Sequence, residues 1–288
     1  MEIGLDISDK KIYAALVDNL DVIESIDESI YSHKRDNNKK IVEKVLALID
    51  EVFNSEVESI GLSLPSKLDI KKGVIYDLEK IPYWKGIGLK KIIEKEFRIP
   101  AVINNDINCF LLGEKYHGLC KDFQNILGIS LDSNVGASLV VDNKIFLGQH
   151  PYFHNIKCLS EACYHWVNYY RKSYAKTVEE LNLLFSSFDE QWVKNPHHEA
   201  WKILGTLTGR LISIILSNYN PQIIVLGGNL SRFYSYFCAA LDKYLEKFLH
   251  PRILVNIIIV TSLVNNSRPL GAAAMCTKNC YSTDTALK

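Results

Sequence analysis

The chain has 288 residues, no formal net charge, and hydrophobic and charged residues at 48% and 23%. This length accommodates two lobes of a globular protein, and the neutral balance offers no general attraction to nucleic acid or to an anionic membrane. No apolar run approaches the roughly 18 residues of a membrane span, and Met1–Asp6 lacks the basic start of a signal peptide. The seven scattered cysteines suit reduced thiols. We therefore expect a cytoplasmic protein with neither nucleic-acid nor membrane partners.

The first part of the chain alternates short apolar segments with polar turns. Turns at 8–10 and 18–19 predict antiparallel hairpins, and apolar residues at helical spacing predict helices further along. The expected elements are strands at 3–5, 11–17 and 22–23, a helix at 41–49, a strand at 57–64, a helix at 89–97 and a strand at 101–103.

A similar order recurs in the second part of the chain. The expected elements there are strands at 125–131, 135–141 and 144–147, helices at 159–170 and 201–219, a strand at 222–226, a helix at 233–248, a strand at 254–260 and a helix that begins near Pro269. Such a repeat predicts a duplicated α/β fold of two lobes, with a ligand-binding cleft between them. We place the first lobe at 1–117 and the second at 118–268, and we expect a helix within 269–288 to pack back on the first lobe.

Asp106 lies where the strand at 101–103 passes into a helix. Open α/β sheets bind ligands at such strand-to-helix turns, and an Asp there is placed to act as a general base toward a substrate hydroxyl. Asp and Asn are also common helix caps, and Asn104, Asn105 and Asp106 are all candidates for that role. Position alone leaves both interpretations open.

Six motifs together resemble the ROK family (repressors, open reading frames, kinases) in order and spacing. They are Gly4-Leu5-Asp6-Ile7, Gly61-Leu62-Ser63-Leu64-Pro65, Trp84-Lys85-Gly86, Asn105-Asp106-Ile107-Asn108 with Gly113-Glu114, Asn220-Pro221-Gln222-Ile223-Ile224-Val225-Leu226-Gly227-Gly228, and Arg268-Pro269-Leu270-Gly271-Ala272-Ala273. The resemblance implies a two-lobe, duplicated ribonuclease H-like α/β fold of the actin/hexokinase-like superfamily, with a central interlobe cleft. It also implies a homodimer.

The family's active members phosphorylate hexoses and N-acetylhexosamines with ATP, and its repressors add an N-terminal DNA-binding domain that we do not expect here. The resemblance makes Asp106 the catalytic base, places Asn105 on another sugar hydroxyl, and directs Asp6 toward the magnesium and phosphate region. Gly227 and Gly228 would let the nucleotide approach the backbone closely. Without the resemblance, the two glycines equally predict a plain strand-to-helix turn.

Both phosphate loops depart from the family pattern. The first, Asp-x-Gly-Gly-Thr-Lys in the family, is Asp6-Ile7-Ser8-Asp9-Lys10-Lys11 here, so Asp9 brings a negative charge that Lys10, Lys11 or Mg²⁺ would have to offset. The second, Gly-Thr-Gly-Ile-Gly, is Asp132-Ser133-Asn134-Val135-Gly136. Glycine-rich loops bind phosphate because bare backbone amides converge on it. The phosphate-binding residues that we expect to persist are Asp6, Lys11, Ser133, Gly136, Gly227 and Gly228.

The segment that should contact the sugar also differs from the family pattern. In one register Asn155 replaces the family's sugar-binding Glu and Cys158 its His; in another, Glu161 stands in for a second sugar-contacting Glu. The family's zinc loop, Cys-x-Cys-Gly-x-x-Gly-Cys, is missing, so we expect no zinc. His154, Cys158, Cys163 and His165 are suitable zinc ligands in type, but their spacing favours a surface loop.

These observations support two main hypotheses. The first is a sugar kinase that depends on ATP and Mg²⁺, with Asp106 as base, because Asp6, Asn105, Asp106 and both glycines at 227–228 remain. The alternative is a catalytically silent relative that binds a sugar or a partner, because both phosphate loops and the zinc segment are degenerate. The sequence does not name the sugar.

Overall fold

A computed structural model of the chain describes its architecture in two units. Unit 1 comprises Met1–Asp122, Asn143–Asn155 and Leu263–Lys288, and unit 2 comprises Phe123–Asp142 and Ile156–Ser262. The residues that the structure describes are 1–8, 11–19, 21–30, 38–65, 67–70, 72–77, 87–147, 167–217, 219–277 and 280.

The core of unit 1 is a five-stranded sheet in the order β3-β2-β1-β4-β7. Strands β1, β2 and β3 form an antiparallel meander, and β4 and β7 run parallel to β1. The hairpin of β5 (Lys67–Asp69) and β6 (Val74–Asp77) is separate from this sheet. The strands of the main sheet are β1 Glu2–Ile7, β2 Lys11–Asp18, β3 Asp21–Ser29, β4 Ser59–Leu64 and β7 Ala101–Asn105.

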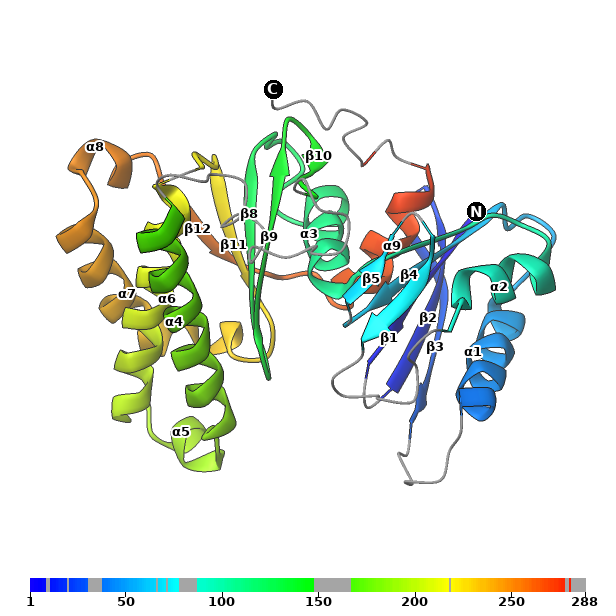
Figure 1. Cartoon of the computed structure of the whole chain (residues 1–288), viewed down its shortest axis with the longest axis horizontal. Coiled ribbons are helices and arrows are strands. Elements are labelled where there is room, and N and C mark those ends of the chain that lie inside the picture. Colours follow the sequence, from blue (N-terminus) through cyan, green and yellow to red (C-terminus); the bar gives the residue numbers. More distant parts are fainter. Residues whose placement is uncertain are drawn as a thin grey trace. The chain divides into compact units, whose positions relative to one another are not determined.

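Alternation along the strands sorts the side chains between the two faces of this sheet. Leu5 and Leu62 belong to an apolar core that includes residues of α1 (Asn38–Val52) and α2 (Leu89–Phe97). Figure 1 shows these two helices on one face of the sheet, with α3 (Asp106–His117) and α9 (Ser267–Thr277) on the other.

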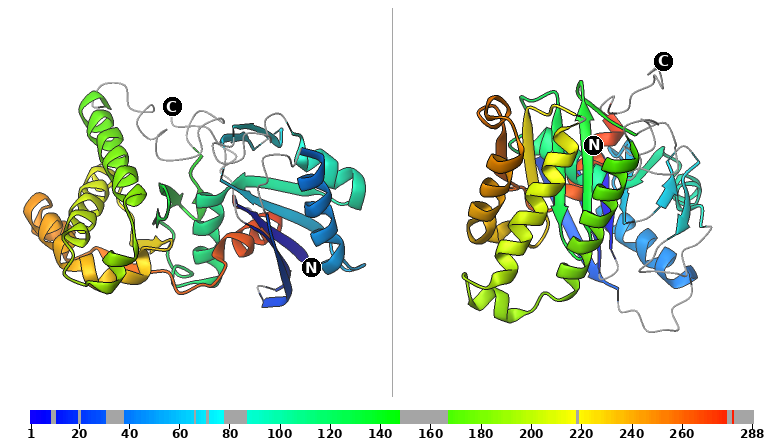
Figure 2. Two further views of the ribbon diagram at one scale, coloured as in Figure 1. Left: turned by 90° about the horizontal axis from the view of Figure 1, so that it is seen from below. Right: turned by 60° about the vertical axis from the view of Figure 1, so that its left-hand side comes forward.

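Helix α9 packs on β1, β4 and α3 with almost no space between the backbones (Figures 1 and 2). A Cβ added to Gly4 would lie 1.9 Å from the carbonyl oxygen of Pro269, and one added to Gly61 would lie 1.9 Å from that of Ala272. The approach to α3 is equally tight at Gly113, where a Cβ would lie 2.0 Å from the carbonyl oxygen of Ser267. Glycine is therefore required at the points where this helix meets the sheet and α3.

Unit 2 repeats the arrangement of the sheet. Its strands lie in the order β9-β8-β11-β12, with β9 antiparallel to β8 and with β11 and β12 parallel to it. Helices α4 and α6, and α6 and α7, pack against each other. The elements of the second half of the chain are β8 Ile126–Leu131, β9 Val135–Val141, β10 Lys144–Ile145, α4 Val167–Ser186, α5 Glu190–Lys194, α6 Glu199–Leu216, β11 Ile223–Gly227, the 3₁₀ helix η3 Ser231–Phe233, α7 Tyr234–Phe248, α8 Pro251–Leu254 and β12 Ile258–Thr261.

The predicted α/β class and the duplicated strand order are confirmed. Two expected elements are corrected. The helix expected at 159–170 runs over Val167–Ser186 in the described residues, since buried Tyr174, Val178 and Leu181 continue the helical spacing. The strand expected at 254–260 begins only at Ile258.

The late start of β12 has a local cause. Pro251 occupies the first turn of α8, and Nδ1 of His250 accepts a hydrogen bond from the Arg252 N–H at 3.2 Å as the helix cap. The apolar residues of 253–260, interrupted only by Asn256, do not by themselves distinguish helix from strand, so this turn was missed. Among the described residues, no helix is long and apolar enough to cross a membrane.

The packing of α9 predicts that Gly61→Ala destabilises the protein. The added methyl group meets backbone atoms, which cannot rotate away, so we expect the free energy of unfolding to fall by at least about 2 kcal/mol. Urea denaturation followed by circular dichroism measures this change. Gly88→Ala is the matched control, because nothing lies within 4 Å of a Cβ added there. An equal effect of the two substitutions would contradict the packing argument.

Candidate functional site

Asp6 and Ser63 lie side by side on the face of the sheet that α9 covers. They are register partners on the parallel strands β1 and β4, each two residues after the glycine that contacts α9. The Ser63 hydroxyl, which is fully buried, donates a hydrogen bond of 2.6 Å to Oδ1 of Asp6. The Asp6 carboxylate is thereby held in one orientation, with 17% of its side chain exposed.

Asp106 is the first residue of α3, directly after β7. The N-cap of this helix is Asn105, whose side-chain oxygen accepts a hydrogen bond of 3.0 Å from the Ile107 N–H. Oδ1 of Asp106 accepts from the same N–H at 2.9 Å. Asn104 is buried, and its Oδ1 accepts hydrogen bonds from the Asn105 N–H and from Nδ2 of Asn108. Asn105 therefore supplies the cap, and Oδ2 of Asp106 faces another group.

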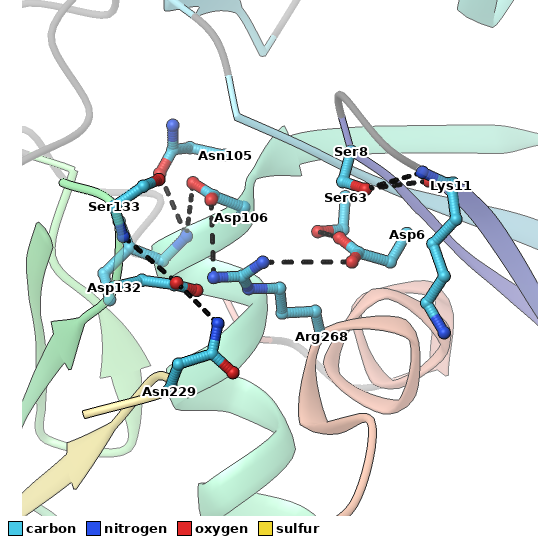
Figure 3. Close-up of polar contacts among 11 residues, drawn as sticks. Asp6, Ser8, Lys11, Ser63, Asn105, Asp106, Asp132, Ser133, Asn229 and Arg268 are labelled. Carbon is cyan, nitrogen blue, oxygen red and sulfur yellow. Dashed lines mark hydrogen bonds and ion pairs between the residues drawn. The ribbon is translucent and has the colours of Figure 1, made fainter. Parts of the chain in front are cut away.

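That group is the guanidinium of Arg268, at the start of α9. Its Nη2 lies 3.8 Å from Oδ2 of Asp106, and its Nη1 lies 4.0 Å from Oδ2 of Asp6. Figure 3 shows the guanidinium between the two carboxylates. The side chains of Arg268 and Asp106 are 26% and 22% exposed, so this triad is partly shielded from water. Arg268 lies in one of the motifs quoted above, but no local pattern there indicates its pairing with the two carboxylates.

Cys109 lies beneath the triad, on the first turns of α3. Burial, followed by the charge of Asp6, raises the pKa of the Cys109 thiol well above its ordinary value. The thiol is therefore protonated at neutral pH, and a thiolate nucleophile is not available at this place. Cys109 is thus a small, buried and uncharged neighbour of the three charged side chains.

The structure places Lys11 away from this triad. Its ammonium lies 3.6 Å from the Asp27 carboxylate of β3 and 5.5 Å from the centre of the Tyr13 ring. Hydrogen bonds in both directions between Ser8 and the Lys11 backbone close the turn that precedes β2. The predicted phosphate-binding role of Lys11 stays a prediction.

In unit 2, polar groups of the loop between β8 and β9 form hydrogen bonds within the loop and with neighbouring side chains. Oδ1 of Asp132 accepts hydrogen bonds from the Ser133 N–H at 3.0 Å and from Nδ2 of Asn229 at 2.9 Å (Figure 3). The N–H of Val135 donates to Oδ1 of Asn182 on α4 at 2.9 Å. A carboxylate of the protein thus occupies a backbone amide that a phosphate-binding loop would offer to its ligand.

The glycine pair after β11 lies against the same loop. Gly228 has φ +84°, and a Cβ there would lie 2.5 Å from the Leu131 carbonyl oxygen, so glycine is required at this turn. Gly227 ends β11 opposite Ser130, and Gly136 pairs with Ser130 across β8 and β9. The contact with Leu131 explains Gly228 structurally, and the predicted contact of all three glycines with a nucleotide stays a prediction. Asn155, Glu161 and the possible zinc ligands His154, Cys158, Cys163 and His165 lie outside the described residues.

Comparison with known proteins decides the family. A model described as "ROK family" matches residues 2–153 and 180–279. The chain belongs to the ROK family. An uncharacterised protein of Clostridium perfringens is 26% identical over 281 residues, which cover 91% of this chain and 92% of the relative. The xylose repressor of Bacillus subtilis is 22% identical over 254 residues, which cover 79% of this chain and 64% of the repressor.

Solved structures support the same fold. A ROK family glucokinase from Streptomyces griseus, in complex with glucose and AMPPNP, superposes with a TM-score of 0.71 at 17% identity, covering 95% of this chain and 98% of the glucokinase. The proteins similar to this ROK protein thus include a glucokinase and a xylose repressor by name.

ATP and magnesium are candidate ligands of a ROK protein, and the described residues do not fit them as they stand. The Ser133 amide is already bonded to the Asp132 carboxylate. Mg²⁺ requires oxygen ligands at about 2.0–2.1 Å, whereas a guanidinium lies between the carboxylates of Asp6 and Asp106. In the part of the chain that is described, no three His, Cys, Asp or Glu side chains form a group that could hold a metal ion.

The contacts of Asp132 lead to a prediction about phosphate binding. Asp132→Asn removes a negative charge beside the loop amides, and repulsion between unit charges about 4 Å apart amounts to about 1 kcal/mol even in water. We therefore expect the variant to bind ADP at least about fivefold more tightly than the wild type. Isothermal titration calorimetry measures both affinities.

Asp242→Asn is the control for charge alone, because it removes an exposed carboxylate of α7 in the same unit. ADP affinity that is the same in all three proteins would show that Asp132 does not oppose phosphate.

Proposed function

We propose that this ROK protein binds a sugar of the hexose or N-acetylhexosamine class through Asn105 and Asp106. The observation that carries the proposal is the placement of these two side chains, both partly exposed, at the carboxyl end of the parallel strand β7. Ligands of open α/β sheets bind at this end of the strands. An amide and a carboxylate together accept and donate the hydrogen bonds that neighbouring sugar hydroxyls require.

The named relatives support a sugar in preference to other ligands. The Streptomyces griseus protein is a glucokinase bound to glucose, and the Bacillus subtilis protein is a xylose repressor. One is an enzyme by name and the other is a regulator, so a sugar is the feature that their names share. The proposal for this chain rests on that shared feature and on the position of Asp106.

The first candidate activity is phosphorylation of the bound sugar, dependent on ATP and Mg²⁺, with Asp106 as general base. Its support is that Asp106 is not the helix cap and directs Oδ2 away from the first turn of α3, toward the region where Asp6 also lies. A base must reach the hydroxyl proton that it accepts, and a partly exposed carboxylate at a strand end satisfies that requirement.

The second candidate is sugar binding without phosphoryl transfer, and the contacts of the described residues favour it over the first. Asp132 bonds to the amide of the degenerate phosphate loop, and Arg268 pairs with both carboxylates of unit 1. Both contacts support this candidate, because a kinase would need the loop amide for its nucleotide and the carboxylates for its metal ion.

Sugar binding predicts a rise in melting temperature that depends on Asp106. A sugar at 100 times its Kd stabilises the folded state by about 2.7 kcal/mol. We expect one or more hexoses or N-acetylhexosamines to raise the melting temperature of the wild type, and Asp106→Ala to lose most of this rise. Differential scanning fluorimetry with a panel of sugars measures it. Asp50→Ala, a change of an exposed carboxylate on α1, serves as the control.

A phosphorylation assay with the sugar that binds then distinguishes the two candidate activities. Turnover with MgATP that Asp106→Asn abolishes, while that variant remains folded, would establish the kinase. Sugar binding without turnover would establish the silent protein. If no sugar of the panel stabilises the wild type, the proposal of sugar binding is wrong.

A further inference from the structure

The carboxylates of Asp6 and Asp106 come from distant parts of the chain and meet at one cation. Asp6 belongs to β1 and Asp106 to α3, and Arg268 contacts the Oδ2 atom of each. One guanidinium thus lies within 4.0 Å of an oxygen of each carboxylate.

The position of Arg268 is fixed by backbone packing. The residues on both sides of it are in close contact with glycines of other elements: the carbonyl of Ser267 lies against Gly113 of α3, and that of Pro269 lies against Gly4 of β1. The backbone of Arg268 is therefore held between the two elements that carry Asp6 and Asp106. An ordinary surface arginine has no such restraint, and many surface ion pairs contribute little for that reason.

The surroundings favour a permanent pairing. All three charged side chains are about three-quarters buried or more, so water screens them only partly. An arginine is protonated at every accessible pH, and its charge repels any second cation that approaches the same two oxygens. Asp6 is further held in this orientation by the buried Ser63 hydroxyl.

We propose that Arg268 is the resident cation of this carboxylate pair: it excludes divalent cations from Asp6 and Asp106, and its removal opens a divalent-cation site there. The residue thereby determines whether unit 1 can hold a metal ion. This inference goes beyond the proposed sugar binding and does not depend on it.

Titration with Mn²⁺ tests the proposal, with the unbound ion followed by electron paramagnetic resonance and with neither sugar nor nucleotide present. The wild type should bind no Mn²⁺ at Asp6, so that Asp6→Asn leaves its titration unchanged. Arg268→Gln should bind one ion that the wild type does not bind, because the positive charge that repels it from the two carboxylates is gone. Adding Asp6→Asn to Arg268→Gln should abolish the gain.

Two further variants distinguish charge from packing. Arg268→Lys keeps a cation and should behave as the wild type does. Arg210→Gln removes a comparably buried arginine of unit 2, which pairs with Glu180 and Thr177, and should gain no Mn²⁺ site.

Two results would overturn the proposal. One is Mn²⁺ binding by the wild type that Asp6→Asn removes, a result that requires no arginine variant to fold. The other is a folded Arg268→Gln protein, verified by circular dichroism, that binds Mn²⁺ no better than the wild type. Because no sugar is present, neither result bears on sugar binding.

Discussion

Contact between bare backbones, where α9 meets β1, β4 and α3, is the constraint on which unit 1 depends. Gly4 and Gly61 are register partners, so the two neighbouring strands together form a surface without side chains against α9. No side chain fills the interface at these points, which leaves the helix almost no freedom to slide. The polar side chains that project from this face of the sheet therefore lie at fixed positions relative to α9.

Because every second side chain of a β-strand lies on the same face, the strands that pack on α9 also position polar side chains beside it. Two residues beyond each glycine, the side chain again points to the α9 face, and there the chain carries Asp6 and Ser63. Arg268, near the start of α9, lies beside Asp6. Asp106, at the start of α3, lies on the other side of the same guanidinium. On each strand the glycine lets α9 approach, and the next residue on that face is the polar Asp6 or Ser63. The same glycine-x-polar order therefore accounts both for the helix packing and for the candidate site.

Much of this could be predicted from the sequence, because the signals are local. Alternation and helical spacing located most strands and helices, and the motifs around Asp6, Asn105 and Asp106 indicated the fold and suggested a candidate site. Local signals failed at α8, where one apolar run contains both a helical turn and a strand. They also left the cap of α3 undecided among three adjacent polar residues, a choice that the backbone makes in favour of Asn105, which is extended and directly precedes the first helical residue.

Contacts between distant residues account for what the sequence could not predict. Arg268 pairs with residues 162 and 262 positions earlier in the chain, and no spacing rule connects them. The bond from Asn229 to Asp132 spans 97 positions. A signal did exist for Ser63: Gly61-Leu62-Ser63 repeats the small-apolar-polar order of Gly4-Leu5-Asp6, which predicts that both polar residues share a face.

The place of α9 in the chain has a consequence for biosynthesis. Unit 1 begins at Met1, but its α9 follows the whole of unit 2 in the sequence, so a ribosome completes the sheet of unit 1 long before it makes the helix that covers one face. Until then the glycine face is bare and Asp6 and Asp106 lack their arginine. Domains generally fold as they emerge, so unit 2 has the means to fold first, and unit 1 reaches its final structure only after α9 has been made.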